Sequence, residues 1–303
     1  MPRSYLVPIL LLLAPAFVAA DNKAPKPPAA KQSPHSVTLH GDTRVDPFFW
    51  LREKSNPEVI KYLEAENAYT AAMTKSTQEL EKSLYDEMLG RIKQTDLDVP
   101  VRRGAYEYFS RTEKGKQYPI YCRKKVGPKE AEEVLVDANE LAKGQKFLSV
   151  QGYNVSDDAN LLAYMMDTTG FREYHLFVKD LRSGEVLPDR VGKVAGFTWT
   201  ADNKTVFYVT EDQAKRPHKL WRHVLGTPKD HDALVLEEKD ELFRLSVNRS
   251  RDKKYVFAGS RSSTSTEVRY LPSDKPTGEF AVVLPREAEH EYSVDHRDGL
   301  FYI

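Results

Sequence analysis

Polar turns followed by short hydrophobic strands recur from residue 155 to the end of the chain. The pattern is clearest where the turn 156–160 precedes the apolar run 161–166, and it returns about every 45 to 50 residues. Later copies place 200–204 before 205–209, 248–252 before 255–258, and 294–299 before 300–303. Repeats of this length, built from short strands, are typical of β-propeller blades. Because the last copy stops inside its strand, we expect the chain to be part of a longer protein.

Alternation of apolar and polar positions predicts further strands inside these repeats. Segments 106–111 and 118–123 predict a hairpin around Gly115, and 173–181 and 219–225 predict strands of later repeats. A blade has about four strands, and propellers have about four to eight blades. The region 101–303 therefore has room for about four blades, and a mainly β fold is predicted.

The region before residue 100 has helical periodicity instead. Asn56 is a suitable N-cap, with Pro57 at the first helical position. The residues 76–79 match a capping box that would open a second helix, in which apolar residues recur every four positions from Leu80 to Met88. We therefore predict a helical segment over 36–100 and a partial propeller over 101–303.

The composition favours a globular protein without a strong electrostatic partner. Hydrophobic residues make up 40% of the chain and aromatic residues 11%, which is enough to form hydrophobic cores. Since 45 basic residues balance 45 acidic ones, charge gives no reason to expect a nucleic-acid partner. Cys122 is the single cysteine, which excludes an internal disulfide and metal sites built from several thiolates.

The first residues resemble a targeting signal. Arg3 precedes an apolar stretch over 5–18, and small residues end at Ala20 before Asp21. This pattern predicts a signal peptide over 1–20 and an exported, periplasmic or secreted protein. The apolar stretch is too short to span a membrane, although a lipid-facing anchor is an alternative. Residues 21–35, rich in Lys, Pro and Ala, predict a flexible tail.

Motifs for nucleophilic catalysis and phosphate binding are missing from the sequence. An α/β-hydrolase presents its nucleophile in Gly-x-Ser-x-Gly, and no serine here has a glycine two positions before it. The nearest similar stretch, at Gly259 and Ser260, lacks the spacing and falls in a predicted blade loop. Neither Gly-x-Gly nor Gly-Lys-Ser/Thr occurs. We therefore assign no catalytic, cofactor-binding or metal-binding residue.

Several reactive side chains have a structural interpretation that we favour. His218, His223 and His231 could supply metal ligands, but positions five apart in one strand point to opposite faces. Solvated loop or strand-edge histidines are the preferred interpretation, and a metal-dependent hydrolase is a minor alternative. His175 is expected to be a packed or edge residue, and Cys122 a strand cysteine without a nucleophilic role.

The segment 40–51 is interpreted as an irregular, aromatic stretch. Asp42, Arg44 and Asp46 could form an acid–base cluster, but local hydrogen bonds and ion pairs that fix the segment are the preferred role. The aromatic residues 48–50 are expected to anchor the segment on a neighbouring part of the protein, rather than to form a binding platform.

Several stretches of the sequence resemble the oligopeptidase B branch of the prolyl oligopeptidase family of serine peptidases. The segment 40–51, HGDTRVDPFFWL, is similar to the N-terminal segment of these enzymes, and 115–123 is similar to their first blade. Further similar segments are 62–69, 91–96, 167–174 and 220–223. The resemblance runs in register from about residue 35 to residue 303.

The resemblance implies a seven-bladed propeller that covers an α/β-hydrolase domain with a Ser-Asp-His triad. Residues 36–100 would pack on that domain, and 101–303 would supply about four to five blades. Such enzymes cleave short peptides after Arg or Lys without a cofactor, and the propeller limits access to the site. The triad belongs to the C-terminal half, which is the implied partner, so the chain alone is expected to be inactive.

A free-standing, propeller-like protein-binding module is the main alternative. The two interpretations differ in what the reading frame encodes downstream of Ile303. Further blades and a Gly-x-Ser-x-Gly motif would favour the peptidase, and a stop codon would favour the binding module.

Overall fold

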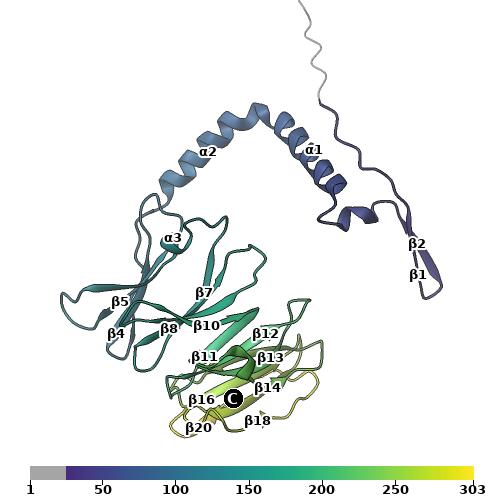
Figure 1. The fold of residues 1–303 in the computed structure, drawn as a ribbon. Coiled ribbons are helices and arrows are strands. Elements are labelled where there is room, and N and C mark those ends of the chain that lie inside the picture. The colour runs from purple at the N-terminus through teal and green to yellow at the C-terminus, as the bar shows by residue number, and fades with distance from the viewer. Residues whose placement is uncertain (1–24) are drawn as a thin grey trace, which may run out of the picture. The chain divides into compact units, whose positions relative to one another are not determined.

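The computed structural model describes residues 25–303, so the predicted signal peptide over 1–20 lies outside the described residues. The chain divides into two compact units, with the boundary after Lys93. Figure 1 shows the two long helices and a hairpin in the first unit and the larger β-sheets in the second, and each unit is described by itself.

The first unit contains a hairpin and two main helices. The elements are β1 (His35–Leu39), β2 (Asp42–Asp46), the 3-10 helix η1 (Phe49–Arg52), α1 (Pro57–Met73), the 3-10 helix η2 (Lys75–Thr77) and α2 (Gln78–Arg91). His40 and Gly41 join the two strands with φ angles of 51° and 83°. Two consecutive positive φ values suit a tight hairpin turn. The expectation of an irregular segment is therefore wrong for residues 40–46.

The two helix starts differ from each other. The prediction for α1 is confirmed, because the Asn56 side chain accepts a hydrogen bond from the Glu58 backbone N–H at 2.9 Å. The capping box predicted for α2 is wrong. The chain passes from α1 through η2 into α2, and the Thr77 hydroxyl donates to the Thr74 carbonyl at 2.8 Å. Thr77 thus makes no side-chain cap.

The apolar positions predicted to share helix faces are exposed. Leu80, Leu84 and Met88 on α2 have exposed fractions of 59%, 47% and 58%, and Leu63 on α1 has 52%. The two helices form as predicted, but no other part of the described residues covers these apolar side chains. Within residues 25–303, no helix is long and apolar enough to cross a membrane.

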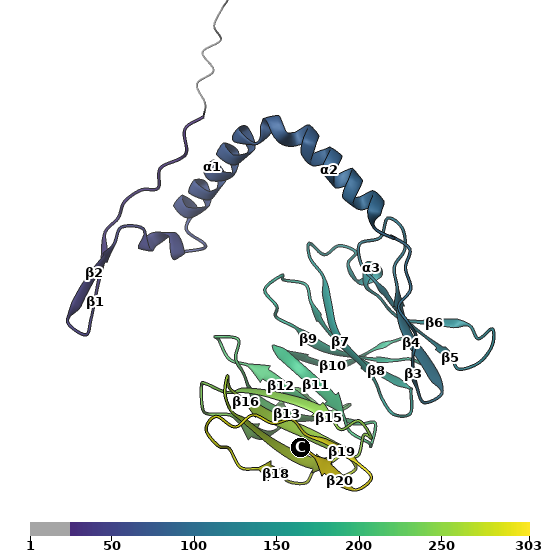
Figure 2. The same cartoon turned by 180° about the vertical axis from the view of Figure 1, so that it is seen from behind.

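The second unit is an open β-propeller with four antiparallel, four-stranded blades, numbered here in chain order (Figures 1 and 2). Blade 1 contains β3 (Val101–Arg103), β4 (Tyr106–Arg111), β5 (Ile120–Lys125) and β6 (Glu132–Asp137). Blade 2 contains β7 (Ser149–Val155), β8 (Leu161–Asp167), β9 (His175–Asp180) and β10 (Val186–Gly192). Blade 3 contains β11 (Val194–Trp199), β12 (Thr205–Glu211), β13 (Pro217–Val224) and β14 (Ala233–Glu237).

Blade 4 and a C-terminal hairpin complete the unit. Blade 4 contains β15 (Arg244–Arg249), β16 (Tyr255–Arg261), β17 (Thr266–Pro272) and β18 (Ala281–Leu284). The C-terminal hairpin consists of β19 (Asp295–Arg297) and β20 (Leu300–Tyr302). Two short helices, α3 (Ala138–Leu141) and the 3-10 helix η3 (Lys229–His231), lie in connections. The predicted fold class, mainly β with an incomplete propeller, is confirmed.

The second strand of each blade has two buried faces. In β8, Leu162 and Tyr164 enter the cluster shared with blade 1, whereas Ala163 and Met165 enter the cluster shared with blade 3. This follows from the alternation of side chains along a strand. Blades therefore hold together by packing sheet on sheet.

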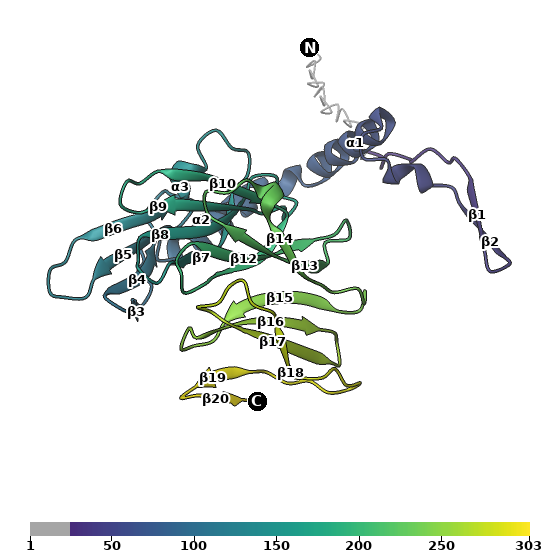
Figure 3. The ribbon, with the colours of Figure 1, turned by 60° about the horizontal axis from the view of Figure 1, so that its bottom comes forward.

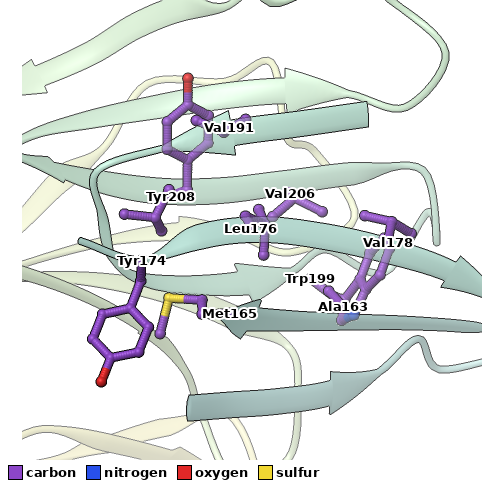
Figure 4. Packing of buried hydrophobic residues seen from close by; sticks show 10 residues of the cluster. Ala163, Met165, Tyr174, Leu176, Val178, Val191, Trp199, Val206 and Tyr208 are labelled. Carbon is purple, nitrogen blue, oxygen red and sulfur yellow. The ribbon is translucent and has the colours of Figure 1, made fainter. Parts of the chain in front are cut away.

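The largest of these clusters lies between blades 2 and 3, and Figure 4 shows its side chains between the two sheets. Trp199 is 1% exposed and lies beside Ala163 and Val178. Its indole N–H donates to the carbonyl of Asn154 in blade 2 at 3.0 Å. The cluster thus combines apolar burial with a directional hydrogen bond between blades.

The same arrangement continues to the end of the chain. In β12, Phe207 and Val209 face blade 4, while the intervening Tyr208 faces blade 2. At the C-terminal hairpin, Phe301 packs against Tyr270 of blade 4 with ring centroids 4.7 Å apart. Figure 3 shows β19 and β20 beside the sheet of blade 4.

A buried hydrogen-bond network also joins blades 2 and 3. The Nε2 atom of His223 lies 2.9 Å from Asp189 in blade 2, and its Nδ1 atom lies 2.6 Å from Asp232 in blade 3. Tyr208 donates a further hydrogen bond to Asp232 at 2.6 Å. The expectation of a solvated or edge histidine is therefore wrong for His223, which is 3% exposed. The half-buried His218 on the same strand and the exposed His231 make no such network.

We predict that His223→Phe destabilises the protein by about 3 kcal/mol or more, because two buried carboxylates lose their partner. Urea denaturation followed by tryptophan fluorescence measures the change. His218→Gln, on the same strand, is the control and should change stability by less than about 0.5 kcal/mol. Equal effects of the two substitutions would contradict the inter-blade role of His223.

Candidate functional site

The turns between the first and second strands of blades 2, 3 and 4 share one hydrogen-bonding motif. A hydroxyl donates to an aspartate two residues later, in the pairs Ser156–Asp158 at 2.6 Å, Thr200–Asp202 at 2.6 Å and Ser250–Asp252 at 2.7 Å. The backbone N–H of the Ser or Thr residue also bonds across the turn to the first residue of the next strand. These short polar residues satisfy the backbone of the turn locally.

Each turn also holds one residue in the left-handed region. The φ angles are 60° at Ala159, 55° at Asn203 and 65° at Lys253. Asparagine adopts this region readily, whereas alanine and lysine do so at a cost. The hydrogen bonds of the turn therefore stabilise a conformation that the local chain does not favour.

The turn aspartates are held in the ionised form. Burial alone would raise the pKa values of Asp158, Asp202 and Asp252, but the hydrogen bonds that each carboxylate accepts outweigh burial and lower the pKa below the ordinary 3.8. Asp202 accepts bonds from the Thr200 hydroxyl and from the backbone N–H of Lys204. The carboxylates therefore act as hydrogen-bond acceptors that stabilise the turns.

The turns of blades 2 and 4 help to line a cavity, which we call the turn cavity. The first strands lie innermost, since β11 packs between β7 and β15. The cavity has a volume of about 680 Å³ and is lined by the turns of blades 1, 2 and 4 and by the end of β11. Propellers place such spaces on their central axis.

Charged side chains from two non-adjacent blades meet in the turn cavity. Asp157 in blade 2 lies 3.0 Å from the Arg249 guanidinium and 2.8 Å from the Lys253 ammonium, both in blade 4. Arg103 of blade 1 and Arg251 of blade 4 also line the cavity. Its charged groups are therefore mostly cationic, and they lie beside apolar and aromatic lining residues such as Phe197 and Trp199.

The serine hydroxyls of the turn cavity are engaged within the turns. No histidine or cysteine is among its lining residues, and the Ser156 and Ser250 hydroxyls donate to turn aspartates. Among residues 25–303, no group of three or more His, Cys, Asp or Glu side chains is placed to hold a metal ion. The cavity thus supplies charge and shape without a nucleophile and base pair.

The structure places the other candidate residues in structural positions. Cys122 is fully buried in β5, and burial, with the nearby Glu132, raises the pKa of its thiol to about 12. Ser260 is fully buried in β16, so its assignment to a blade loop is wrong. His175 is half-buried in β9 and its ring packs against Gly192, in keeping with the packed or edge role expected for it.

Local contacts hold the aromatic stretch 48–50 of the first unit and the residues around it. Asp46 accepts a hydrogen bond from the Phe48 backbone at 2.8 Å, and Arg44 pairs with Asp42 at 3.3 Å, as expected for local contacts. The Trp50 indole donates to the Lys31 carbonyl at 2.8 Å. Lys31 lies in the range predicted to be a flexible tail, so part of that range has a defined contact.

The repeated blades and turns match a known family. The description of the matching family is "Prolyl oligopeptidase, N-terminal beta-propeller domain", and the match covers residues 27–303. The chain belongs to the prolyl oligopeptidase family. The predicted resemblance is thereby confirmed.

Relatives within the prolyl oligopeptidase family are much longer than the matched region. The chain is 39% identical to dipeptidyl aminopeptidase BI of Pseudoxanthomonas mexicana, over 97% of this chain and 43% of that protein. It is 38% identical to protease 2 of Moraxella lacunata, over 89% of this chain and 40% of that protein. The chain therefore spans about two fifths of the length of these relatives.

Solved structures of the family have the same fold. Oligopeptidase B from Leishmania major superposes with a TM-score of 0.83 at 30% identity, over 89% of this chain and 41% of that chain. Oligopeptidase B from Trypanosoma brucei, in a closed form with covalently bound antipain, superposes with a TM-score of 0.82 at 30% identity, over 90% of this chain and 41% of that chain.

Sequence reasoning found the turns but missed the charges that meet between them. Asp157, Arg249 and Lys253 lie in the repeated turn segments, yet nothing in the spacing indicates that blade 2 contacts blade 4. The sequence did contain one signal for these charges, which is a difference between the repeats. Asp157 in the turn of blade 2 corresponds to Ala201 in the turn of blade 3.

We predict that Asp202→Ala destabilises the protein by about 1–3 kcal/mol at pH 7, because several buried donors lose their acceptor. The turn aspartates have lowered pKa values when folded, so the stability they contribute is present above about pH 4 and is lost as pH falls through the folded values. Urea denaturation at pH 7 and pH 3 should show a smaller loss for the variant than for the wild type. Asp274→Ala, at an exposed turn position after β17 that has no positive φ angle, is the control.

Proposed function

We propose that this chain is the N-terminal, access-limiting propeller portion of a serine-type oligopeptidase. The observation that carries the proposal is the match of residues 27–303 to the propeller domain of the prolyl oligopeptidase family. The open propeller of four blades and the length of the relatives support it. The triad would come from a C-terminal hydrolase half, so the chain alone is inactive.

The proposed reaction is hydrolysis of short peptides after Arg or Lys. It is supported by the similarity to proteins named protease 2 and oligopeptidase B. In this proposal, peptides reach the hydrolase half by way of the propeller axis, and the turn cavity is one section of that path. The absence of a nucleophile and base pair from the lining residues agrees with a role in access.

A second candidate reaction is the removal of dipeptides from the N-terminus of peptides. The relative that is 39% identical bears the name dipeptidyl aminopeptidase BI. The two reactions differ in their need for a free substrate N-terminus. N-terminally blocked and free substrates therefore distinguish them.

We predict that the protein encoded by the full reading frame cleaves blocked reporters with Arg or Lys before the scissile bond, and that residues 1–303 alone do not. Rates are compared with those for matched Pro and Ala reporters and for unblocked dipeptide reporters. Cleavage of unblocked dipeptides alone would favour the aminopeptidase. A reading frame that ends at residue 303, with no cleavage at all, would replace the peptidase by a binding module.

We also propose that the protein is exported to the periplasm or secreted, on the basis of the pattern of residues 1–20. The expected mature N-terminus is Asp21, because small residues at Val18 to Ala20 precede it. N-terminal sequencing of the protein purified from the native cell checks this. A retained Met1 or a lipid-modified N-terminus would contradict it.

A further inference from the structure

Three side chains connect blades 2 and 4 across the turn cavity, and we call them the cross-blade clasp: Asp157, Arg249 and Lys253. One Asp157 oxygen lies 3.0 Å from Arg249, and the other lies 2.8 Å from Lys253. All three residues line the turn cavity. A single carboxylate thus holds two cations that come from a blade other than its neighbour.

The blade 4 side of the clasp is rigid. The Arg249 side chain is 9% exposed, and its guanidinium also donates to the Lys253 carbonyl at 2.5 Å. Lys253 is held in the left-handed region of the turn. The Arg249 guanidinium is therefore anchored to the backbone of the turn that carries Lys253.

The blade 2 side belongs to a turn that also contacts its immediate neighbour. The backbone N–H of Asp158 donates to Asn203 in the turn of blade 3 at 3.2 Å. Contacts of this kind hold adjacent blades and leave the axis free. The clasp is different, because it reaches past blade 3 to blade 4.

The two ion pairs of the clasp differ in exposure, since Arg249 is 9% exposed, and the pair with Lys253 is the weaker one. Asp157 is 27% exposed and Lys253 is 55% exposed, so water and salt screen their attraction. Ion pairs with this exposure contribute little to stability. The pair between Asp157 and Lys253 can therefore open and close without separating the buried clusters between the blades.

We propose that the clasp restricts the passage of peptides through the turn cavity and makes Asp157 a determinant of the peptide size that is admitted. This inference rests on the proposed peptidase function. When the clasp is closed, its three side chains lie in the path of a peptide along the axis. When it opens, the cations stay with blade 4 and Asp157 stays with blade 2.

The test compares Asp157→Asn with the wild type in the full-length protein. One substrate is a short blocked Arg reporter, and the other is a peptide of about 25 residues with one Arg. Asp157→Asn should raise kcat/KM for the long peptide about fivefold, the change expected for loss of exposed ion pairs, and should leave the short reporter unchanged. Added salt should stimulate cleavage of the long peptide by the wild type and not by the variant.

Asp298→Asn is the matched control, because it removes one negative charge from the turn of the C-terminal hairpin without touching the clasp. A second variant closes the clasp. Asp157→Cys combined with Lys253→Cys, joined by a short bismaleimide, should slow the long peptide selectively, and the buried Cys122 leaves little background labelling.

The outcomes separate the two proposals. Equal stimulation of both substrates by Asp157→Asn, or no effect of the cross-link on the long peptide, overturns the role of the clasp and leaves the peptidase function in place. Failure of the wild type to cleave even the short reporter overturns the peptidase function, and the inference that rests on it falls as well.

Discussion

Burial of both faces of each middle strand is the constraint on which the propeller depends. In β8, alternate residues such as Leu162 and Ala163 belong to different clusters, one toward each neighbouring blade. A single blade would expose one or both of these apolar faces to water, so no blade is stable by itself. The lone Cys122 supplies no covalent link, and packing between blades therefore carries the fold.

Local signals in the sequence predicted the blades well, whereas contacts between blades were beyond them. Strand β4 has the predicted bounds 106–111, because alternation and turn residues lie close together in the chain. His223 was misjudged because its partner Asp189 is 34 residues away, in another blade. Ser260 was misjudged because the apolar run was taken to end at residue 258, whereas β16 continues to Arg261.

The turns show why a repeat predicts structure more readily than function. Ser156 and Thr200 occupy equivalent positions and make the same hydrogen bond, so their similarity reveals the turn. The next position differs, with Asp157 in blade 2 and Ala201 in blade 3. Residues that recur in every turn make hydrogen bonds to the turn backbone, whereas residues that differ between turns can make other contacts. In this chain the charges in the turn cavity belong to the second group.

Two kinds of contact between blades differ in strength, and the difference allows motion at the axis. Adjacent blades share buried clusters and the His223 network, whose disruption would expose apolar surface or leave buried charges unpaired. Within the clasp, the pair between Asp157 and Lys253 is exposed, so its opening costs little and leaves those contacts intact. A passage controlled by such a contact can respond to a peptide or to salt while the propeller keeps its shape. A buried network at the same place would resist opening, since it would have to leave charges unpaired.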